Sequence, residues 1–483
     1  MATSQLHPNL SASSVFDLAI RISKEDLTGL GPPDLPWEDE VTEERLAAAI
    51  ASALDFMPLA YRQAYVTPVQ QSLGRLAIAT NEEGGDDPAE TVLGAIYEHG
   101  PNSKVAAPLR RFLVVVSDLY NSFIAREKRQ HLNLPLLERL PPLATFRHDG
   151  SLGPYTYTAD VMQQVIGAKI GIVSLPSVYR DHPLLWGSLA HETGGHDVVH
   201  ADPGFLGELK VGAGNVMLAF AASTGTYAQL GPLLSALWQH WIDEATADVF
   251  GVLNIGPAFA LNIAAWLMAL RARLGQTTLP HLLTNSGTMD GSSLDPHPTD
   301  ILRIDLAIGA ISALRSLDSA VKARYLTLLR QIGDAAAGGA STVELDGYLQ
   351  GTDDASFPIS VSLPLPLMQA TASTLGAMIA TAPFAALGGR SIQDIETWDD
   401  FDESAARMIF SCTDAGTAGA IGDPALILAG GTLAALNNPA AYESVNERIA
   451  DALDIAAERD RIWGRPHFQK HSPQAREELA ANV

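Results

Sequence analysis

The sequence predicts a mainly α-helical protein with one small β-sheet. Over most of the chain, apolar residues recur at spacings of three and four, which is the period of an amphipathic helix. Only residues 154–176 show the alternation and the β-branched runs that are typical of strands. A chain of 483 residues can bury a large core, so we expect two or three domains or one elaborated domain.

Helical periodicity defines one region before the predicted sheet and one after it. Residues 1–145 form an N-terminal helical region, and residues 331–483 form a C-terminal one in which Gly- and Ala-rich linkers separate the helices. Residues 146–330 lie between them and contain the predicted strands at 154–158 and 169–173. Helices are expected at 43–79, 89–97, 106–127, 182–196, 233–252, 301–314, 366–382, 425–436 and 444–460.

The composition limits the partners and the chemistry. The formal net charge of −24 disfavours a nucleic-acid partner, because phosphate binding needs a surplus of Lys and Arg on one face. Cys412 is the single cysteine, so an intramolecular disulfide and a cysteine-based zinc site are excluded. Any metal must therefore be bound by His, Asp and Glu.

The N-terminal segment has no basic stretch followed by an apolar one, so we expect a cytoplasmic protein. The most apolar run, residues 249–270, approaches the length of a membrane span but contains Asn254, Pro257 and Asn262. We interpret this run as a buried core helix and expect no membrane partner.

The segment HETGGHDVVHAD, residues 191–202, carries the candidate metal ligands. His191 and His196 are five residues apart, which in a regular helix would separate them by roughly 140° around the axis. Gly194 and Gly195 lie between them and permit a bulge or widened turn that would bring the second imidazole back to the same face. Glu192 lies beside the first histidine, where a general base is expected.

A second assignment uses HDVVH, residues 196–200. His196 and His200 have the regular spacing of four, with Asp197 in the place of the glutamate. The shorter carboxylate of Asp197 would have to reach the water from farther away. His200 could alternatively be a histidine at a helix end near Asp202, and the segment could also hold no metal at all.

A third ligand is expected from the segment WIDEATADVFG, residues 241–251. Glu244 and Asp248 are four residues apart on one helix face, so one can bind a metal and the other can orient a histidine ligand. Such a pair is usually a solvated pair of acids. This pair lies within an apolar run, where carboxylates are costly to leave uncompensated.

Farther along the chain, DPHPTDILRI places His297 between two prolines in a loop and Arg303 early in a helix. Alone, His297 would be read as an ordinary loop histidine. Its position after the two other motifs makes it a candidate catalytic residue.

Together, these motifs resemble the gluzincin metallopeptidases. The segment Glu244-Ala-Thr-Ala-Asp248, followed by His297-Pro298 and Arg303, is similar to the HtpX-type and CAAX prenyl protease group. The segment from His191 to His196, an HExxGH motif, is similar to dipeptidyl peptidase III, in which one residue is inserted into HExxH. The resemblance covers about residues 170–310 and matches neither group throughout.

The resemblance implies a zincin-like catalytic region flanked by helical regions, and a peptidase that acts on a peptide or protein substrate. One Zn²⁺ per chain would be bound by His191, His196 and Glu244, and Glu192 would act as general base on a zinc-bound water. His297 would hydrogen-bond the developing oxyanion. Asp248 would orient a histidine ligand, and Arg303 would pair with Asp248 or Glu244.

Two other functions compete with a peptidase. A non-catalytic scaffold or binding protein could retain a vestigial or structural metal site, although such a site has no need of the general base Glu192. A di-iron carboxylate bundle would require Glu-x-x-His pairs, and the spacing from Glu192 to His196 is one residue too long.

Overall fold

The computed structural model describes the chain in several stretches. They are residues 10–25, 43–79, 88–100, 105–137, 139–147, 153–276, 282–287, 294–350, 356–414, 422–460 and 463.

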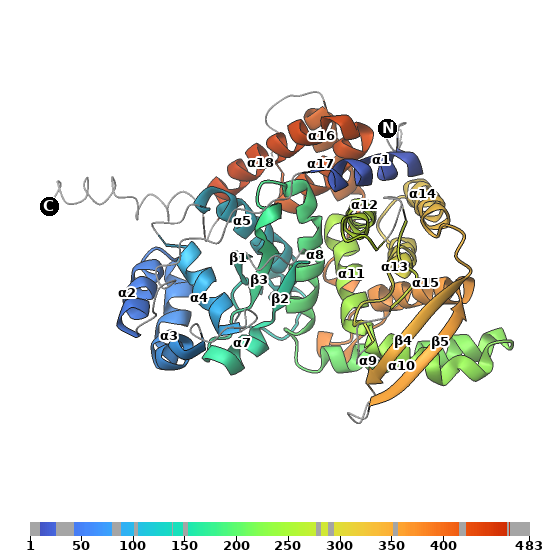
Figure 1. Cartoon of the computed structure of the whole chain (residues 1–483), viewed down its shortest axis with the longest axis horizontal. Helices are drawn as coiled ribbons and strands as arrows, with labels where there is room; N and C mark the ends of the chain where they lie inside the picture. The colour runs from blue at the N-terminus through green and yellow to red at the C-terminus, as the bar shows by residue number, and fades with distance from the viewer. Residues whose placement is uncertain are drawn as a thin grey trace.

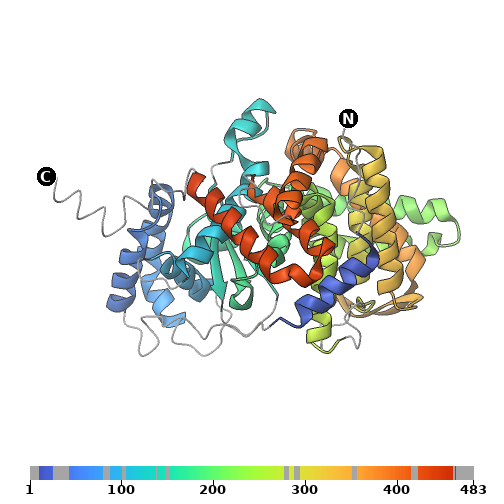
Figure 2. The ribbon, with the colours of Figure 1, turned by 90° about the horizontal axis from the view of Figure 1, so that it is seen from above.

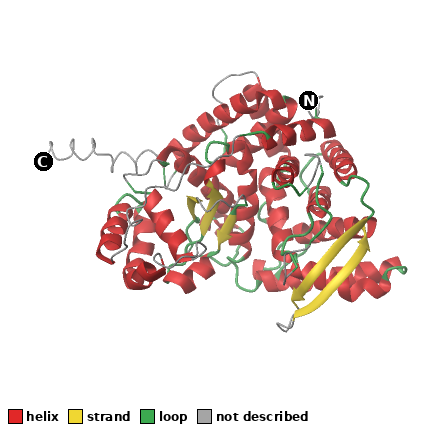
Figure 3. Cartoon of the chain, in the orientation of Figure 1, coloured by secondary structure: helices red, strands yellow, loops and turns green. Residues whose placement is uncertain are grey.

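Helices make up most of the described chain, as the apolar periodicity predicts (Figure 3). The α-helices are α1 (Ala12–Ser23), α2 (Glu43–Leu54), α3 (Leu59–Ala79), α4 (Pro88–Glu98), α5 (Ala106–Ile124), α6 (Arg126–His131), α7 (Ala159–Ile166), α8 (Leu189–His191), α9 (Phe205–Thr224), α10 (Gly231–His240), α11 (Ile242–Ile255), α12 (Pro257–Arg273), α13 (Asp300–Ala313), α14 (Ser319–Ala336), α15 (Leu365–Thr381), α16 (Asp400–Asp414), α17 (Pro424–Asn437) and α18 (Tyr442–Arg459). Short turns of other helix types are η1 (Ser177–Tyr179), η2 (Pro183–Ser188), η3 (Glu192–Asp197), η4 (Ala228–Leu230), η5 (Ala385–Leu387), η6 (Ile392–Asp394) and η7 (Pro439–Ala441).

The predicted small sheet is present and has three strands, β1 (Leu143–Arg147), β2 (Tyr155–Tyr157) and β3 (Ile172–Pro176). The strand order is β1-β3-β2, with β1 parallel to β3 and β2 antiparallel to it. Strand β3 is buried along its whole length and begins three residues later than the predicted segment 169–173. Strand β1 lies in a stretch rich in Pro and Gly, before the residues whose pattern predicts strands. Its partner β3 is distant in sequence, so local composition does not reveal the pairing.

A second sheet was not expected. Strands β4 (Thr342–Gln350) and β5 (Ser356–Pro364) form an antiparallel hairpin, which lies beside the α9–α10 pair in Figure 1. The prediction that only residues 154–176 form strands is therefore wrong. Val343, Leu345 and Leu349 alternate with exposed residues along β4, which is the pattern of a strand with one buried face. The surrounding Gly- and Ala-rich composition concealed it.

The apolar run at 249–270 is buried, as expected, but it is not one helix. It spans the end of α11 and most of α12, which meet at Gly256 with φ of +70°. A Cβ on Gly256 would lie 2.4 Å from the ring of Trp398, so glycine is required there for space as well as for its backbone conformation. The predicted helix 233–252 is likewise two helices, α10 and α11, which meet at Trp241.

One other helix, α9, is long and apolar enough to cross a membrane by length and composition, with a mean hydropathy of 1.2. A third of that window, 33%, is buried inside the protein. Such a helix in isolation is weak evidence for a membrane span, because core helices pass the same test.

Segments from both ends of the chain pack on the middle region. Helix α1 contacts α12, α14 and α17, and Figure 2 shows it lying beside the C-terminal helices. Helix α11, which carries the candidate third ligand, packs against α8, η3 and α13. The division at residues 145 and 330 stays a prediction, and a single cluster of buried apolar side chains includes residues from all three regions.

Candidate metal centre

The segment from Leu189 to Asp197 is one turn of α-helix, α8, followed by a wider π-helical turn, η3. A π turn closes with hydrogen bonds from residue i to i+5, so two side chains five apart share a face. This geometry is the widened turn that the spacing of His191 and His196 requires. A Cβ on Gly195 would lie 2.5 Å from the Cα of Ala247, so glycine allows η3 to approach α11 closely.

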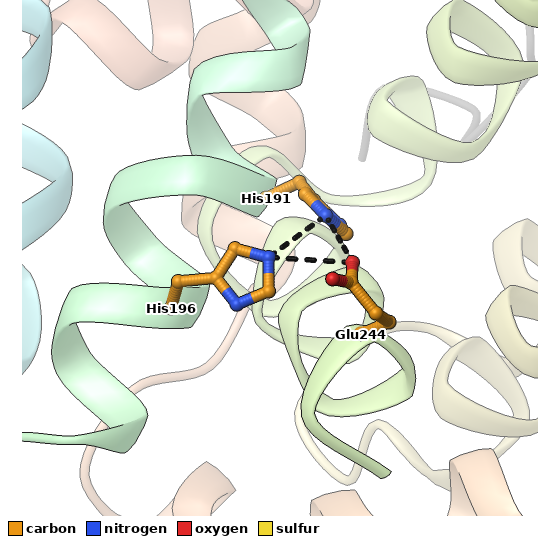
Figure 4. A group of neighbouring side chains, drawn as sticks. All are labelled: His191, His196 and Glu244. Carbon is orange, nitrogen blue, oxygen red and sulfur yellow. Dashed lines mark hydrogen bonds and ion pairs between the residues drawn. The ribbon is translucent and has the colours of Figure 1, made fainter. Parts of the chain in front are cut away.

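Three side chains, from α8, η3 and α11, converge on one point, as Figure 4 shows. The Nε2 atom of His191 lies 3.0 Å from Oε2 of Glu244, and that of His196 lies 3.3 Å from the same oxygen. The two Nε2 atoms are 3.3 Å apart. Each of these three residues offers one ligand atom, and the three atoms lie within 4.8 Å of one another, so the group could hold a metal ion. Within the described part of the chain, no other group of three His, Cys, Asp or Glu side chains does so.

Both imidazoles turn their other nitrogen toward a carboxylate. Nδ1 of His191 lies 2.9 Å from Oδ1 of Asp248, and Nδ1 of His196 lies 3.3 Å from Oδ1 of Asp243. A carboxylate accepts hydrogen bonds, so each neutral imidazole would carry its proton on Nδ1. The lone pairs on both Nε2 atoms then point into the cluster.

Asp248 is held in place by Arg303, which lies on α13. The guanidinium donates from Nε to Oδ2 at 2.8 Å and from Nη2 to Oδ1 at 2.7 Å, and both side chains are buried. Burial alone would raise the pKa of Asp248, but Arg303 and His191 lower it to about 2. The structure thus pairs Arg303 with Asp248, one of the two acids we considered, and places Asp248 on His191.

The electrostatics of the cluster favour a bound cation. Burial opposes charge on Glu244, yet His196 and His297 hold the pKa of that carboxyl well below its usual range. Burial alone would lower the pKa of His196, but Glu244 and Asp243 raise it well above the usual value. Without a metal, the cluster would therefore retain protons at the positions that a metal ion would take.

Glu192 is buried at the start of η3, and its carboxylate is oriented from the small sheet. The hydroxyl of Thr156 on the edge strand β2 donates to Oε2 of Glu192 at 2.9 Å. Glu192 is also close enough to His196 to raise the pKa of that imidazole. The residue is thus positioned beside the cluster without being one of its three converging side chains.

His297 lies on the solvent side of the cluster. Its Nε2 is 3.2 Å from Oε2 of Glu244, and 44% of its side chain is exposed. Asp295 fixes the ring by accepting from the backbone N–H of His297 and by contacting its Nδ1, each at 2.9 Å. The ring stacks on that of His191 with a centroid distance of 6.4 Å.

His200 is not among the converging side chains. Its Nε2 lies 2.8 Å from Oδ2 of Asp243, the carboxylate that also contacts His196. Asp197, which would be the base in the HDVVH assignment, instead accepts from the backbone N–H of Ala159 at 2.8 Å and is fully buried. The geometry therefore favours the pair His191 and His196 over the pair His196 and His200.

The sequence reasoning missed three residues around the site. Thr156 orients Glu192, Asp243 joins His196 to His200, and Asp295 holds His297. Asp243 directly precedes Glu244, and Asp295 precedes His297 by two positions, so both could have been suspected from the sequence. Thr156 has no such signal, because its contact with Glu192 depends on how β2 packs.

Comparisons of the chain with protein-family models, with curated proteins and with solved structures find no match.

Proposed function

We propose that this protein is a zinc-dependent peptidase with a zincin-like catalytic region, in which His191, His196 and Glu244 bind one zinc ion. The observation that carries the proposal is that Nε2 of His191, Nε2 of His196 and Oε2 of Glu244 lie within 3.3 Å of one another, while a carboxylate contacts Nδ1 of each histidine. Two imidazole lone pairs and a carboxylate oxygen repel one another unless a cation lies among them.

The spacing of the three atoms fits zinc. In a tetrahedral site with bonds of about 2.0–2.1 Å, two ligand atoms lie about 3.3 Å apart. The corresponding separations here are 3.0, 3.3 and 3.3 Å. Two histidines and one carboxylate are also the ligand set of hydrolytic zinc sites that leave one position open.

Zinc in such a site polarises a carbonyl group and makes water a stronger acid. The remaining steps belong to residues of the chain. Glu192 accepts the proton of the attacking water at its carboxylate and passes it to the leaving amine. Thr156 keeps that carboxylate oriented, and its hydrogen bond to Oε2 leaves Oε1 for the transferred proton.

His297 supports this proposal from the exposed side of the cluster. With Nδ1 engaged by Asp295, the imidazolium form of His297 also donates from Nε2, which would reach the oxygen of a substrate carbonyl held near Glu244, where negative charge develops. Asp295 fixes the ring through Nδ1, so little ordering is needed when substrate binds.

The small sheet offers a place for an extended peptide. Strand β2 is an edge strand, and its Thr156 touches Glu192, so a peptide paired with β2 would pass the cluster. Pairing of an extended segment with a free sheet edge is a common way of binding peptides. Strand β3, which corresponds to the predicted strand at 169–173, is the central strand of this sheet, so the edge beside Glu192 belongs to β2.

The test compares wild type with Glu192→Gln on a peptide library, with zinc content measured on the same samples. The variant should keep its zinc and lose hydrolysis by about 100-fold or more, the scale expected for removal of a positioned general base. Glu127→Gln, an exposed position on α6, is the matched control and should behave as wild type. Zinc binding without hydrolysis in the wild type would favour a non-catalytic protein with a structural metal site.

A further inference from the structure

Two adjoining cavities lie away from the metal cluster, in the region where α5, α16 and α17 meet. Their volumes are about 360 and 550 Å³. Both are lined by Asp118 and Asn121 of α5 and by Asp423 and Leu426 at the start of α17. The two cavities therefore adjoin along these residues, and together they are called the hollow.

The smaller cavity and the shared border are acidic. Asp118 accepts from the backbone N–H of Ala425 at 3.0 Å, whereas Asp423 makes no capping hydrogen bond to α17 with its side chain. Glu396 is paired with Lys128 at 2.6 Å, so this lysine is already engaged. Burial, together with repulsion from Asp423 and Glu396, raises the pKa of Asp118 to about 7.

The larger cavity is mostly apolar and opens to solvent. Val114, Ala405 and Ile409 line it, and Phe401 and Met408 lie on its exposed side with 77% and 58% of their surface accessible. Large apolar side chains at an opening, with acidic side chains along the border shared with the smaller cavity, form an amphipathic pocket. Such a pocket suits a ligand with an apolar body and a charged end.

A buried hydroxyl in the larger cavity is unsatisfied. Ser117 lines this cavity, is 2% exposed, and its Oγ has no hydrogen-bond partner among the described residues. Buried polar groups are almost always hydrogen-bonded, and an unmade bond is destabilising. Ser117 and Asp118 both line the larger cavity, so one ligand group in it could bind the carboxylate and also bond to the hydroxyl.

The carboxylates of the hollow are not arranged for a metal ion. In the part of the chain that the structure describes, only His191, His196 and Glu244 bring ligand atoms within 4.8 Å of one another as a group of three. The acids around Asp118 are close enough to repel but do not converge on a point. An ammonium group, which donates hydrogen bonds in several directions, matches this spread better than a bare ion.

We propose that the two cavities form a binding site for an organic cation, a primary ammonium on an apolar body. The ammonium binds Asp118 and the hydroxyl of Ser117, and the apolar body lies against Phe401 and Met408. This site is independent of the metal cluster and of the proposed peptidase activity.

Isothermal titration calorimetry of the full chain tests the proposal with hexylamine, and 1-hexanol serves as the uncharged control. Hexylamine should bind saturably at one molecule per chain, and 1-hexanol should bind at least about tenfold more weakly because it lacks the charged hydrogen bond. Equal binding of the two compounds, or no saturable binding of hexylamine, would overturn the proposal.

Three variants locate the site. Asp118→Asn should weaken hexylamine binding by roughly tenfold or more, and Ser117→Ala by roughly threefold to tenfold. Asp346→Asn, on the exposed side of β4, is the matched control and should change nothing. Unchanged affinity in the first two variants would show that the amine binds elsewhere.

A second pair of variants avoids buried positions, in case Asp118→Asn does not fold. Met408→Lys and Met408→Glu change an exposed residue at the opening of the larger cavity. The lysine should repel the amine and weaken binding, whereas the glutamate should not. Equal effects of the two substitutions would contradict binding of a cation there.

Binding should also release protons near pH 7. The bound ammonium stabilises the charged form of Asp118, so a carboxyl that is half protonated when empty ionises on binding. Titrations in two buffers of different ionisation enthalpy measure this release, which Asp118→Asn should reduce. The other charged groups of the hollow are Lys128, Glu396, Asp402, Asp423, Arg459 and Asp460.

Discussion

For each histidine around the candidate metal centre, the proposed role depends on which ring nitrogen faces Glu244. In His191 and His196 that nitrogen is Nε2, because Asp248 and Asp243 engage the Nδ1 atoms. In His200 the Nε2 atom is itself engaged by Asp243. The same type of residue thus has two different roles within one short segment.

Zinc analysis of single variants checks this assignment. His191→Ala and Glu244→Ala should each lose the metal, because two remaining ligands hold zinc weakly. His200→Ala should keep zinc, with an affinity reduced by at most about tenfold through the loosened Asp243. If His200→Ala loses zinc while His191→Ala keeps it, the HDVVH assignment is correct.

Zinc affinity of the wild type should fall as the pH falls. The pKa of His196 is raised well above its usual value by Glu244 and Asp243, so protons compete strongly with the metal. Affinity should therefore rise steadily from pH 6 to pH 8, as measured by competition with a chelator of known pH dependence. A pH-independent affinity over this range would contradict binding through these histidines.

The role of His297 can be separated from that of the ligands. His297→Ala should lower kcat by about 10²–10³ with little change in KM, because the proposed hydrogen bond forms mainly in the transition state. Zinc content should stay the same. Metal loss would instead make His297 a ligand, and an unchanged kcat with a lowered melting temperature would make it a structural residue.

At the level of secondary structure elements, the site depends on the packing of η3 against α11. The π turn brings His196 onto the face of His191, and Gly195 lets the backbone of η3 approach Ala247. Helix α13 packs against α11, and its Arg303 fixes Asp248 by a hydrogen bond. Three elements that are separate in sequence therefore determine where two imidazole rings point.

Replacement of Gly195 by alanine should disturb this contact. The new methyl group would lie 2.5 Å from Ala247, so the elements must move apart, which costs about 1–3 kcal/mol. Zinc affinity should fall as well, since the ligands lie on both elements. Gly207→Ala on α9 is the matched control, because a Cβ there meets nothing within 4 Å, and it should leave stability equal or about 0.5–1 kcal/mol higher. Chemical denaturation and zinc titration measure both effects, and equal stability of Gly195→Ala and wild type would refute the argument.

Across the described part of the molecule, removal from water raises the pKa of several acids. Glu98 is 4% exposed and accepts hydrogen bonds from the hydroxyl of Thr145 and the backbone N–H of Phe146. Burial nevertheless raises the pKa of Glu98 to about 7. Burial raises the pKa of Asp118 and Asp305 to about 7 as well. The formal net charge is −24 at pH 7, so the ionised acids of the folded chain repel one another. This repulsion increases as more acids ionise at higher pH.

The free energy of unfolding should therefore fall between pH 5 and pH 8. In this window the folded protein keeps the proton on Glu98 that the unfolded chain loses near pH 4.5, so raising the pH favours unfolding. Glu98→Gln should reduce the difference in unfolding free energy between pH 5 and pH 8 by about 1–3 kcal/mol. Thermal and chemical unfolding at both pH values measure it, with the exposed Glu127→Gln as control. An unchanged pH dependence in Glu98→Gln would show that Glu98 is ionised in the folded protein.

Local patterns in the sequence were enough to predict the helical class, the small sheet and the buried run at 249–270. The same patterns pointed to His191, His196, Glu244, Asp248, His297 and Arg303 as candidate site residues, because metal ligation restricts residue types and spacings. Each of these inferences depends on neighbours within one or two turns of the chain.

Tertiary packing decided the rest. The π turn forms where α11 approaches η3, and the assignment of Arg303 to Asp248 depends on how α13 crosses α11. The orientation of Glu192 comes from Thr156 on a strand, and β1 exists because β3 is its partner. The β4–β5 hairpin and the hollow around Asp118 likewise join segments that composition does not link. Contacts between residues far apart in sequence leave little trace in local periodicity, because they are selected by the burial and shape of the whole core rather than by the spacing of neighbours.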